Sequence, residues 1–376
     1  MDDQRHLFAI PEDVAYLNCA YMSPQLKSVS EAGYAAVDRK AEPWTVTSDD
    51  FFTDGEVVRS LFARLLNVDA EGVAIAPSVS YGVGIAAANL GLTAGNTIVI
   101  LEEQFPSNVY PWLDVAERSG SVVVTVKRPA DLDWTAAVIE AIDERTAVVA
   151  VPNYHWADGS RVDLAAVGKA VRDAGAALVI DASQSLGAAP LDMAEVRPDY
   201  LVSVGYKWLL GPYSFGYLWV AEDHRFGRPL EHGWITRAKS EDFSGLVDYV
   251  DDYQPGARRY DVGERSNFVL APMAIAALEQ LLEWGIDEVA RYASGLSQHA
   301  ELAATSLGLE PTPAQYRGPH LTGIRVPGGV PPSLAADLAK SGVYVSVRGD
   351  SIRVSAHAFN TAADIDRLFS SLAKLL

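Results

Sequence analysis

Several features that mark common protein classes are scarce in this sequence. Cys19 is the single cysteine among 376 residues, so no intramolecular disulfide can form and a cytoplasmic location is expected. The first residues lack the basic start and apolar run of a signal peptide. No segment approaches the roughly 18 uninterrupted apolar residues of a membrane span. These absences predict a globular protein without a membrane partner.

Positive charge is also in short supply. The chain has 30 lysine and arginine residues against 49 aspartate and glutamate residues, for a net charge of -19. Such a surface repels the phosphates of nucleic acids, so no nucleic-acid partner is expected, and an anionic ligand needs a local binding site. Hydrophobic residues make up 49% of the chain, and its length allows one large domain and a smaller one.

Short apolar runs alternate with helical patterns from about residue 56 to residue 220. This alternation is typical of an α/β fold with a mainly parallel sheet covered by helices on both faces. In such open sheets, ligands bind at the carboxyl ends of the strands. The expected strands cover residues 72–76, 97–101, 121–126, 147–152, 177–181, 200–204 and 217–220.

The remainder of the chain follows a different pattern. Residues 222–262 are polar and aromatic without clear periodicity, which indicates a long irregular excursion. We expect a large domain over residues 18–255 and a smaller α+β domain over residues 256–376, with the N-terminal arm (1–17) beside the smaller one. The elements expected in the smaller domain are helices over 271–284, 289–307 and 362–376 and strands near 322–326, 343–347 and 351–354.

Lys207 ends an apolar, strand-like run and has Tyr206 and Trp208 as neighbours. Burial of an ammonium group is costly unless its pKa falls or the amine is bound covalently. One use of such a lysine is a covalent imine with pyridoxal phosphate (PLP). The alternative is a lysine whose ammonium group reaches solvent from the strand end.

Asp181 ends another apolar run, and 207 minus 181 places it 26 residues before Lys207, which leaves room for a helix and one further strand. The two side chains are therefore expected to face each other across neighbouring strand ends. A PLP enzyme needs a carboxylate at the pyridine nitrogen, because the protonated ring is the better electron sink. Considered alone, Asp181 would fit a cap of the following helix; with Lys207 it indicates a PLP site.

The segment 76–82 (APSVSYG) follows an expected strand and leads into a helical run. Free N–H groups and the helix dipole make such a helix start favourable for a phosphate group. Its small residues allow close approach of the backbone, and the Ser80 hydroxyl can donate a further hydrogen bond. Serine is also a common N-cap residue, so this signal is weak by itself.

Together these motifs resemble the class V aminotransferase family of fold-type I PLP enzymes. The resemblance is carried mainly by Asp181-Ala-Ser-Gln-Ser-Leu-Gly187 and Ser203-Val-Gly-Tyr-Lys-Trp-Leu-Leu-Gly-Pro212. Segments 16–21, 104–112 and 352–361 follow the family in the same order. The family includes cysteine desulfurases, selenocysteine lyases, kynureninases, isopenicillin epimerases and carbon–sulfur lyases. The resemblance implies a large domain with a mainly parallel seven-stranded sheet.

The resemblance implies roles for the matching residues at the cofactor. Lys207 would be the Schiff-base lysine, Asp181 the partner of the pyridine nitrogen and Gln184 a donor to the phenolic oxygen. Phe105 stands where many relatives have a stacking histidine, and its ring still offers a π-face to the pyridine. The implied phosphate-binding residues are Ser78, Val79, Ser80, Ser203 and Tyr206.

On the substrate side, Arg353 matches the arginine that binds the α-carboxylate in the family. A guanidinium suits this task because it forms two parallel hydrogen bonds to a carboxylate. Arg348 is a second candidate for substrate binding. Asn153 falls at a polar contact to cofactor or substrate, and His155 is either a substrate-side acid or base or a loop histidine with a structural role.

Two departures from the family pattern matter. Cysteine desulfurases carry a nucleophilic cysteine before the C-terminal arginine, whereas residues 345–353 contain none, so a persulfide mechanism with that cysteine is excluded. The second is Glu264, where many relatives have a threonine that contacts the neighbouring subunit's phosphate. An ionised Glu264 cannot donate that bond, and Ser266 or Arg265 would have to replace it. A homodimer is expected from the family alone.

The predicted function is that of a PLP enzyme acting at the α-carbon of a small amino acid. Lys207, once freed by the substrate, would be the base at that carbon. Transamination and β-elimination are both open, and epimerisation and carbon–sulfur lysis are alternatives with the same first step. A non-catalytic binding module is the alternative of a different class, and the joint presence of Lys207, Asp181, Gln184 and Arg353 argues against it. No metal site is predicted.

Overall fold

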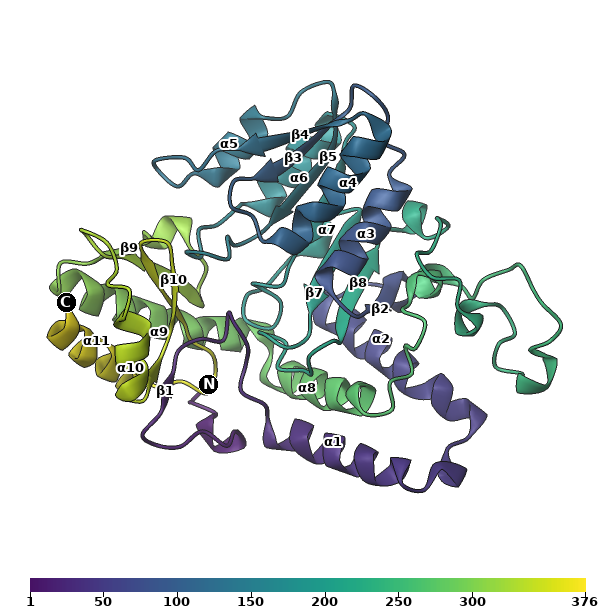
Figure 1. The fold of residues 1–376 in the computed structure, drawn as a ribbon, viewed down its shortest axis with the longest axis horizontal. Helices are drawn as coiled ribbons and strands as arrows, with labels where there is room; N and C mark the ends of the chain where they lie inside the picture. The colour runs from purple at the N-terminus through teal and green to yellow at the C-terminus, as the bar shows by residue number, and fades with distance from the viewer.

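The computed structural model describes residues 1–376 and contains a large and a small α/β unit (Figure 1). The large unit is built on a seven-stranded sheet in the order β2-β8-β7-β6-β5-β3-β4, in which only β8 is antiparallel to its neighbours. The predicted fold class is confirmed, and each strand begins and ends within one residue of its expected bounds. The strands are β2 (Val73–Ala76), β3 (Thr97–Leu101), β4 (Val122–Val126), β5 (Thr146–Pro152), β6 (Ala177–Asp181), β7 (Tyr200–Val204) and β8 (Gly216–Val220).

Helices cover both faces of this sheet. One face packs against α3 (Val79–Asn89) and α4 (Tyr110–Ser119), the other mainly against α2 (Thr53–Leu66), α5 (Trp134–Glu140), α6 (Leu164–Asp173) and α7 (Met193–Val196). Consecutive strand residues such as Ile98 and Val99 enter opposite apolar clusters, because side chains of a strand alternate between the two faces. No helix of the chain has the length and apolar character needed to cross a membrane.

The small unit has a four-stranded antiparallel sheet in the order β12-β13-β10-β9. Three helices pack around one apolar cluster with this sheet, and the last of them starts with a capping box between Thr361 and Asp364. The elements are β9 (Glu310–Pro311), β10 (Leu321–Arg325), β12 (Ser346–Arg348), β13 (Ser351–Ser355), α9 (Ile286–Ser306), α10 (Leu334–Lys340) and α11 (Ala362–Leu375).

The N-terminal arm belongs to the small unit through a separate pair of strands. β1 (Ala15–Tyr16) pairs in parallel with β11 (Val343–Tyr344), so the single strand expected over 343–347 is divided between two sheets. Asn18 then forms a bridge with Ser355, and Ala15 and Leu17 enter the apolar cluster of the small unit. The end of the arm thus packs with the small unit, whereas Phe8 enters the apolar cluster of the large unit.

Helix α8 (Leu270–Trp284) packs with the large unit. It was expected in the smaller domain because it follows the irregular segment. Its buried residues, Ala274 and Leu278 among them, instead join the apolar cluster of the large unit, and it packs against α2 and α1 (Lys27–Lys40), as Figure 1 shows. We therefore propose that the chain passes from the large to the small unit near Gly285, between α8 and α9.

Residues 222–262 contain no α-helix or strand and only short 3₁₀ helices, in agreement with the expected irregular excursion. Their end is fixed in the large unit by the buried Asp261. This carboxylate accepts a hydrogen bond from the backbone N–H of Ile75 at 2.8 Å and pairs with the guanidinium of Arg59. A long segment without secondary structure is therefore held beside β2.

Candidate active site

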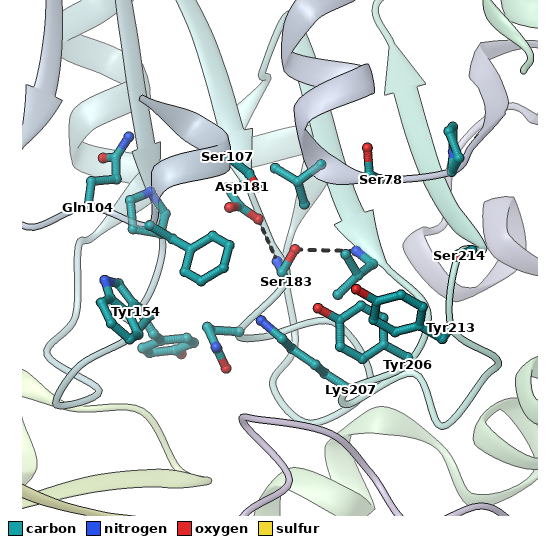
Figure 2. Close-up of a pocket in the computed structure, with 17 residues that line it drawn as sticks. Ser78, Gln104, Ser107, Tyr154, Asp181, Ser183, Tyr206, Lys207, Tyr213 and Ser214 are labelled. Carbon is teal, nitrogen blue, oxygen red and sulfur yellow. Dashed lines mark hydrogen bonds between the residues drawn. The ribbon is translucent and has the colours of Figure 1, made fainter. Parts of the chain in front are cut away.

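A cavity of about 270 Å³ lies at the carboxyl ends of β5, β6 and β7 and beside the start of α3 (Figure 2). This is the edge at which ligands were expected. The side chain of Lys207 points into the cavity, with Asp181 on the opposite side (Figure 2). The lining residues are Pro77, Ser78, Val79, Gln104, Phe105, Ser107, Pro152, Tyr154, Trp156, Asp181, Ser183, Gln184, Val204, Tyr206, Lys207, Tyr213 and Ser214.

Asp181 and Lys207 come from neighbouring strand ends. Asp181 is the last residue of β6 and pairs with Val202 of β7, and Lys207 follows the end of β7. Each residue is only 6% exposed. One oxygen of Asp181 accepts the backbone N–H of Ser183 at 3.1 Å. Burial raises the pKa of Asp181, and the hydrogen bonds of Ser183 and the Lys207 ammonium only partly offset this rise.

Burial lowers the pKa of Lys207 to about 8, although the nearby Asp181 carboxylate acts in the opposite direction. The positive charge of Arg353 adds to the lowering. At pH 7, roughly a tenth of this amine is therefore neutral, far more than for an ordinary lysine, and the neutral amine is the form that reacts with a carbonyl group. The Lys207 nitrogen lies 5.1 Å from the centre of the Phe105 ring and 5.8 Å from that of Tyr206.

Phe105 and Trp156 form an aromatic wall of the cavity. Their rings meet edge to face, with 5.6 Å between the ring centres and 79° between the planes. The indole N–H of Trp156 donates to the backbone carbonyl of Glu103 at 2.7 Å, which fixes the ring against the loop after β3. Trp156 has no recognisable signal in the sequence, because no pattern indicates where a loop tryptophan points.

Gln184 lines the cavity with an amide group of fixed orientation. Its side-chain oxygen accepts the indole N–H of Trp208 at 2.9 Å, and its nitrogen donates to the carbonyl of Ala20 at 3.1 Å. The close contact of Trp208 with this loop requires Gly187, because a Cβ there would lie 2.0 Å from the Trp208 carbonyl oxygen. The second hydrogen on the amide nitrogen remains available.

The start of α3 borders the cavity, and Ser78 and Val79 line it. Ser78 is the N-cap residue, and its hydroxyl accepts the N–H of Tyr81 at 3.2 Å. The hydroxyls of Ser78 and Ser80 lie 3.0 Å apart, but Ser80 is exposed and does not line the cavity. Gly82 allows the helix to pack closely on the sheet, since a Cβ there would lie 2.7 Å from Val202.

Arg353 is 1% exposed and has no acidic partner within the chain. It donates to the backbone carbonyl of Trp156 at 2.6 Å and to the hydroxyl of Ser346 at 3.4 Å, and its Nε atom has no hydrogen-bond partner. Burial, together with the positive charge of Arg348, lowers the pKa of Arg353 to about 9. A buried guanidinium without a counter-ion is costly, so this position favours an anionic ligand.

The structure does not bring His155 into the cavity. Its ring is fully buried, stacks on Trp134 with 5.5 Å between ring centres, and lies with Nε2 3.1 Å from the carbonyl of Glu102. The other nitrogen lies 3.3 Å from the Arg128 guanidinium. Burial lowers the pKa of His155. Of the two expected roles, we therefore assign the structural one and withdraw His155 as a candidate acid or base.

Neither Arg353 nor Arg348 lies among the residues that line the cavity, and Ser203 and Asn153 are also outside the lining. Ser203 is buried, and its hydroxyl donates to the carbonyl of Val204 at 3.2 Å. Val204 faces the cavity instead, because neighbouring residues of β7 point to opposite faces of the sheet. We therefore withdraw Ser203 as a phosphate ligand, whereas Tyr206 does line the cavity. Asn153 is buried, with a side-chain oxygen that lacks a hydrogen-bond partner.

Arg265 was one of two residues expected to replace the threonine that is missing at Glu264, and its contacts do not suit that role. Arg265 is buried and forms ion pairs with Asp261 at 3.2 Å and with Glu56 at 3.4 Å. These contacts leave Arg265 unsuited to a phosphate of a neighbouring subunit. Glu264 is exposed and Ser266 is half-buried, so Ser266 remains as the possible hydroxyl donor of this segment.

Several lining residues had no recognisable signal in the sequence. Tyr154 and Trp156 come from the loop after β5, and Tyr213 and Ser214 from the loop between β7 and β8. Ser183 lies inside the quoted Asp181 motif, and its hydroxyl accepts the N–H of Val204 at 3.2 Å (Figure 2). Counting outward from Asp181 would have identified Ser183; the positions of the loop residues depend on packing.

The residues around the cavity fit PLP. A neutral amine is available at Lys207, a phenyl ring at Phe105, and unpaired N–H groups at the start of α3. Asp181 is a buried carboxylate without an arginine or lysine in ion-pair contact, so its charge is costly unless a cation approaches. A protonated pyridine nitrogen is such a cation. The fold and this cavity together define a PLP-dependent enzyme of fold type I.

The chain matches the aminotransferase class-V family over residues 24–368, and it therefore belongs to that family. It is 26% identical over 330 residues to the uncharacterized aminotransferase YcbU of Bacillus subtilis (strain 168), with 85% of this chain and 83% of that protein covered. The isopenicillin N epimerase of Amycolatopsis lactamdurans is 27% identical over 342 residues, with 84% of each covered.

Solved structures share the fold. A complex of the cystine C-S lyase C-DES with its reaction product cysteine persulfide superposes with a TM-score of 0.88 at 20% identity. The match covers 96% of this chain and 98% of that one. At this level of identity the likeness establishes the arrangement of the two units and leaves the reaction open.

Proposed function

We propose that this enzyme acts at the α-carbon of a small amino acid, by transamination or β-elimination. The main support is the position of Arg353, a buried guanidinium without an acidic partner, close enough to Lys207 to lower the pKa of its amine. An amino acid that reacts at Lys207 through its α-amine also carries a carboxylate on the α-carbon. Arg353 is the group that binds this carboxylate and thereby orients the α-hydrogen.

Lys207 has two tasks in this proposal. As a neutral amine it would hold PLP covalently, and once freed it would take the proton from the α-carbon of the substrate. PLP would supply the withdrawal of electrons from that carbon. Asp181 would hold the proton on the ring nitrogen, Phe105 would cover a face of the ring, and the start of α3 would hold the phosphate.

The fate of the α-proton separates the possible reactions. Transfer of this proton from Lys207 to the cofactor gives transamination. Departure of a group from the β-carbon gives elimination. Epimerisation requires return from the opposite face, and carbon–sulfur lysis is a form of elimination. A cysteine desulfurase activity is not proposed: residues 345–353 contain no cysteine, and Cys19 is fully buried with its pKa raised by burial.

The test is to mix the PLP-loaded enzyme with a panel of amino acids and to follow the visible spectrum and the products. Formation of pyridoxamine phosphate supports transamination, and pyruvate with ammonia or sulfide supports elimination. The variant Arg353→Gln should retain the cofactor but lose the spectral response to amino acids by about a hundredfold, the loss expected for a buried, charge-assisted hydrogen-bond pair. An unchanged response of this variant would refute the role of Arg353.

We further propose a homodimer in the cytoplasm. Tyr213 lines the cavity and is 62% exposed, and Tyr34, Trp44 and Tyr110 are also largely exposed. A second subunit would cover such apolar side chains and close this side of the cavity. The single cysteine fits a reducing compartment. Light scattering of the purified protein tests the dimer, and a mass of one chain would refute it.

A further inference from the structure

Arg348 lies on the same face of the same hairpin as Arg353. In the antiparallel pair β12 and β13, Ser346 is opposite Arg353 and Arg348 is opposite Ser351. Because residues two apart on a strand share a face, Arg348 is the diagonal neighbour of Arg353. The backbones of such diagonal neighbours lie roughly 7–8 Å apart in ordinary sheets. The hairpin thus presents two guanidinium groups side by side.

Both arginines contact Trp156, which lines the cavity. The backbone carbonyl of Trp156 accepts a hydrogen bond from Arg353 at 2.6 Å. The guanidinium carbon of Arg348 lies 5.5 Å from the centre of the Trp156 ring, a cation–π contact. Arg348 also donates to the carbonyl of Val347 at 2.8 Å, which fixes its side chain further. Trp156 therefore joins the cavity to the second guanidinium.

Arg348 faces a cleft of about 1170 Å³ between the large and small units. Gln104 and Trp156 line both this cleft and the cavity, so the two spaces meet at these side chains. A substrate whose α-carbon lies at Lys207 can therefore extend its side chain past Trp156 into the cleft. The cleft is far larger than a small side chain needs, so its charges and not its volume define what binds.

The acidic residues of the cleft wall are already paired or lie at its edge. Glu103 and Asp158 form ion pairs with Arg128. Glu310 pairs with Arg325, and Asp350 lies exposed on the turn of the hairpin.

Arg348 is thus the one cation of the wall without an acidic partner. It is half-buried and close enough to Arg353 and Lys207 to lower the pKa of each. One α-carboxylate compensates Arg353 and leaves this second charge unpaired.

We propose that Arg348, stacked on Trp156, binds a second acid group of the substrate. The substrate is then an amino acid with a carboxylate at the end of a short side chain, such as aspartate, glutamate or 2-aminoadipate. The separation of diagonal neighbours on the hairpin matches two carboxylates a few bonds apart. This inference rests on the proposed function, because Arg353 must hold the α-carboxylate for Arg348 to meet the second one.

The experiment is a spectral titration of the PLP-loaded enzyme with matched pairs of amino acids. Aspartate is compared with asparagine, and glutamate with glutamine, because each pair has the same length and differs in the acid group. At least one acid should bind at least tenfold more tightly than its amide. In Arg348→Gln this preference should disappear, while the Kd for the amides and for alanine stays within about twofold of the wild type.

The double variant Arg325→Gln/Glu310→Gln is the matched control. Arg325 also lines the cleft but pairs with Glu310, so removal of both charges together should leave the preference for acids unchanged. Equal binding of acids and amides by the wild type would overturn the second acid site while leaving the proposed function intact. The same holds if Arg348→Gln weakens alanine as strongly as the acids, because both arginines would then bind a single carboxylate. If no amino acid changes the spectrum, the proposed function fails as well.

Discussion

Trp208 donates its indole N–H to the side-chain oxygen of Gln184 at 2.9 Å, and this bond decides which end of the amide is available to the cavity. With its oxygen directed at Trp208, Gln184 presents its nitrogen to the cavity, and the hydrogen that its bond to Ala20 leaves free can be donated there. The implied role of Gln184 as a donor to the phenolic oxygen of PLP thus depends on the residue that follows Lys207. Trp208 is accordingly a positioning residue.

Trp208→Phe keeps a ring at this position but removes the N–H group. We expect affinity for PLP to fall by about tenfold and the free energy of unfolding by about 1–3 kcal/mol, because the Gln184 oxygen is left buried and unpaired. Trp134→Phe is the control, since Trp134 is fully buried and donates to Ser160 at 2.9 Å away from the cavity. It should lose similar stability and retain PLP affinity; an equal loss of affinity in both variants would contradict the positioning role.

The rate at which the apoenzyme takes up PLP should depend on pH through Lys207. The amine reacts only when neutral, and burial lowers its pKa to about 8 from the ordinary value near 10.5. The rate should therefore rise with pH, with a midpoint near 8, and level off above it. In Asp181→Asn the midpoint should move to lower pH, because the carboxylate that favours the ammonium is gone. Stopped-flow absorbance measures this rate, and a midpoint near 10 would contradict the burial argument.

Replacement of His155 should affect stability and leave catalysis intact. His155→Asn removes the stacking on Trp134 and the contact with the Glu102 carbonyl, at an expected cost of about 1–3 kcal/mol in the free energy of unfolding. The kcat and its pH profile should match those of the wild type, whereas Lys207→Ala should abolish turnover. Denaturant unfolding and steady-state kinetics measure the two effects. A tenfold lower kcat at unchanged stability would restore His155 as an acid or base.

The packing of α3 on the sheet offers a test of the phosphate site. Gly82→Ala places a methyl group 2.7 Å from Val202, which should push the helix start outward and lower stability by about 1–3 kcal/mol together with PLP affinity. A second substitution, Val202→Ala, removes the obstructing methyl groups and should recover part of both losses. Gly295→Ala in α9 meets no atom within 4 Å and should be neutral or slightly stabilising. Failure of the double variant to recover would show that the contact is not the cause.

The sheet could be predicted closely because its strands, apart from the edge strand β4, are buried on both faces. Continuous apolar runs end where each strand ends, and this also placed Asp181 and Lys207 at one edge. A continuous apolar run does not indicate which face of the sheet each side chain points to. Ser203 was therefore expected at the phosphate, whereas Val204 is the residue that faces the cavity. Counting alternate residues along β7 would have distinguished the two.

Other parts of the site depend on packing between distant segments. Trp156 and Tyr213 reach the cavity from loops whose course no local pattern determines. The sequence of α8 predicts a regular apolar helix but not the unit against which it packs. Only its contacts with α1 and α2 assign it to the large unit. The sequence left the role of His155 open for the same reason, because its partners Trp134 and Arg128 come from other segments of the chain.

The pairing of the N-terminal arm with the last part of the chain has a consequence for biosynthesis. β1 finds its partner β11, and Asn18 its partner Ser346, 328 residues later. During translation the arm must therefore remain unpaired until residues 343–355 have left the ribosome. Ala20, the acceptor of the Gln184 amide, lies shortly after this arm. The wall of the active site around Gln184 is accordingly completed only after the strands of both units have been synthesised.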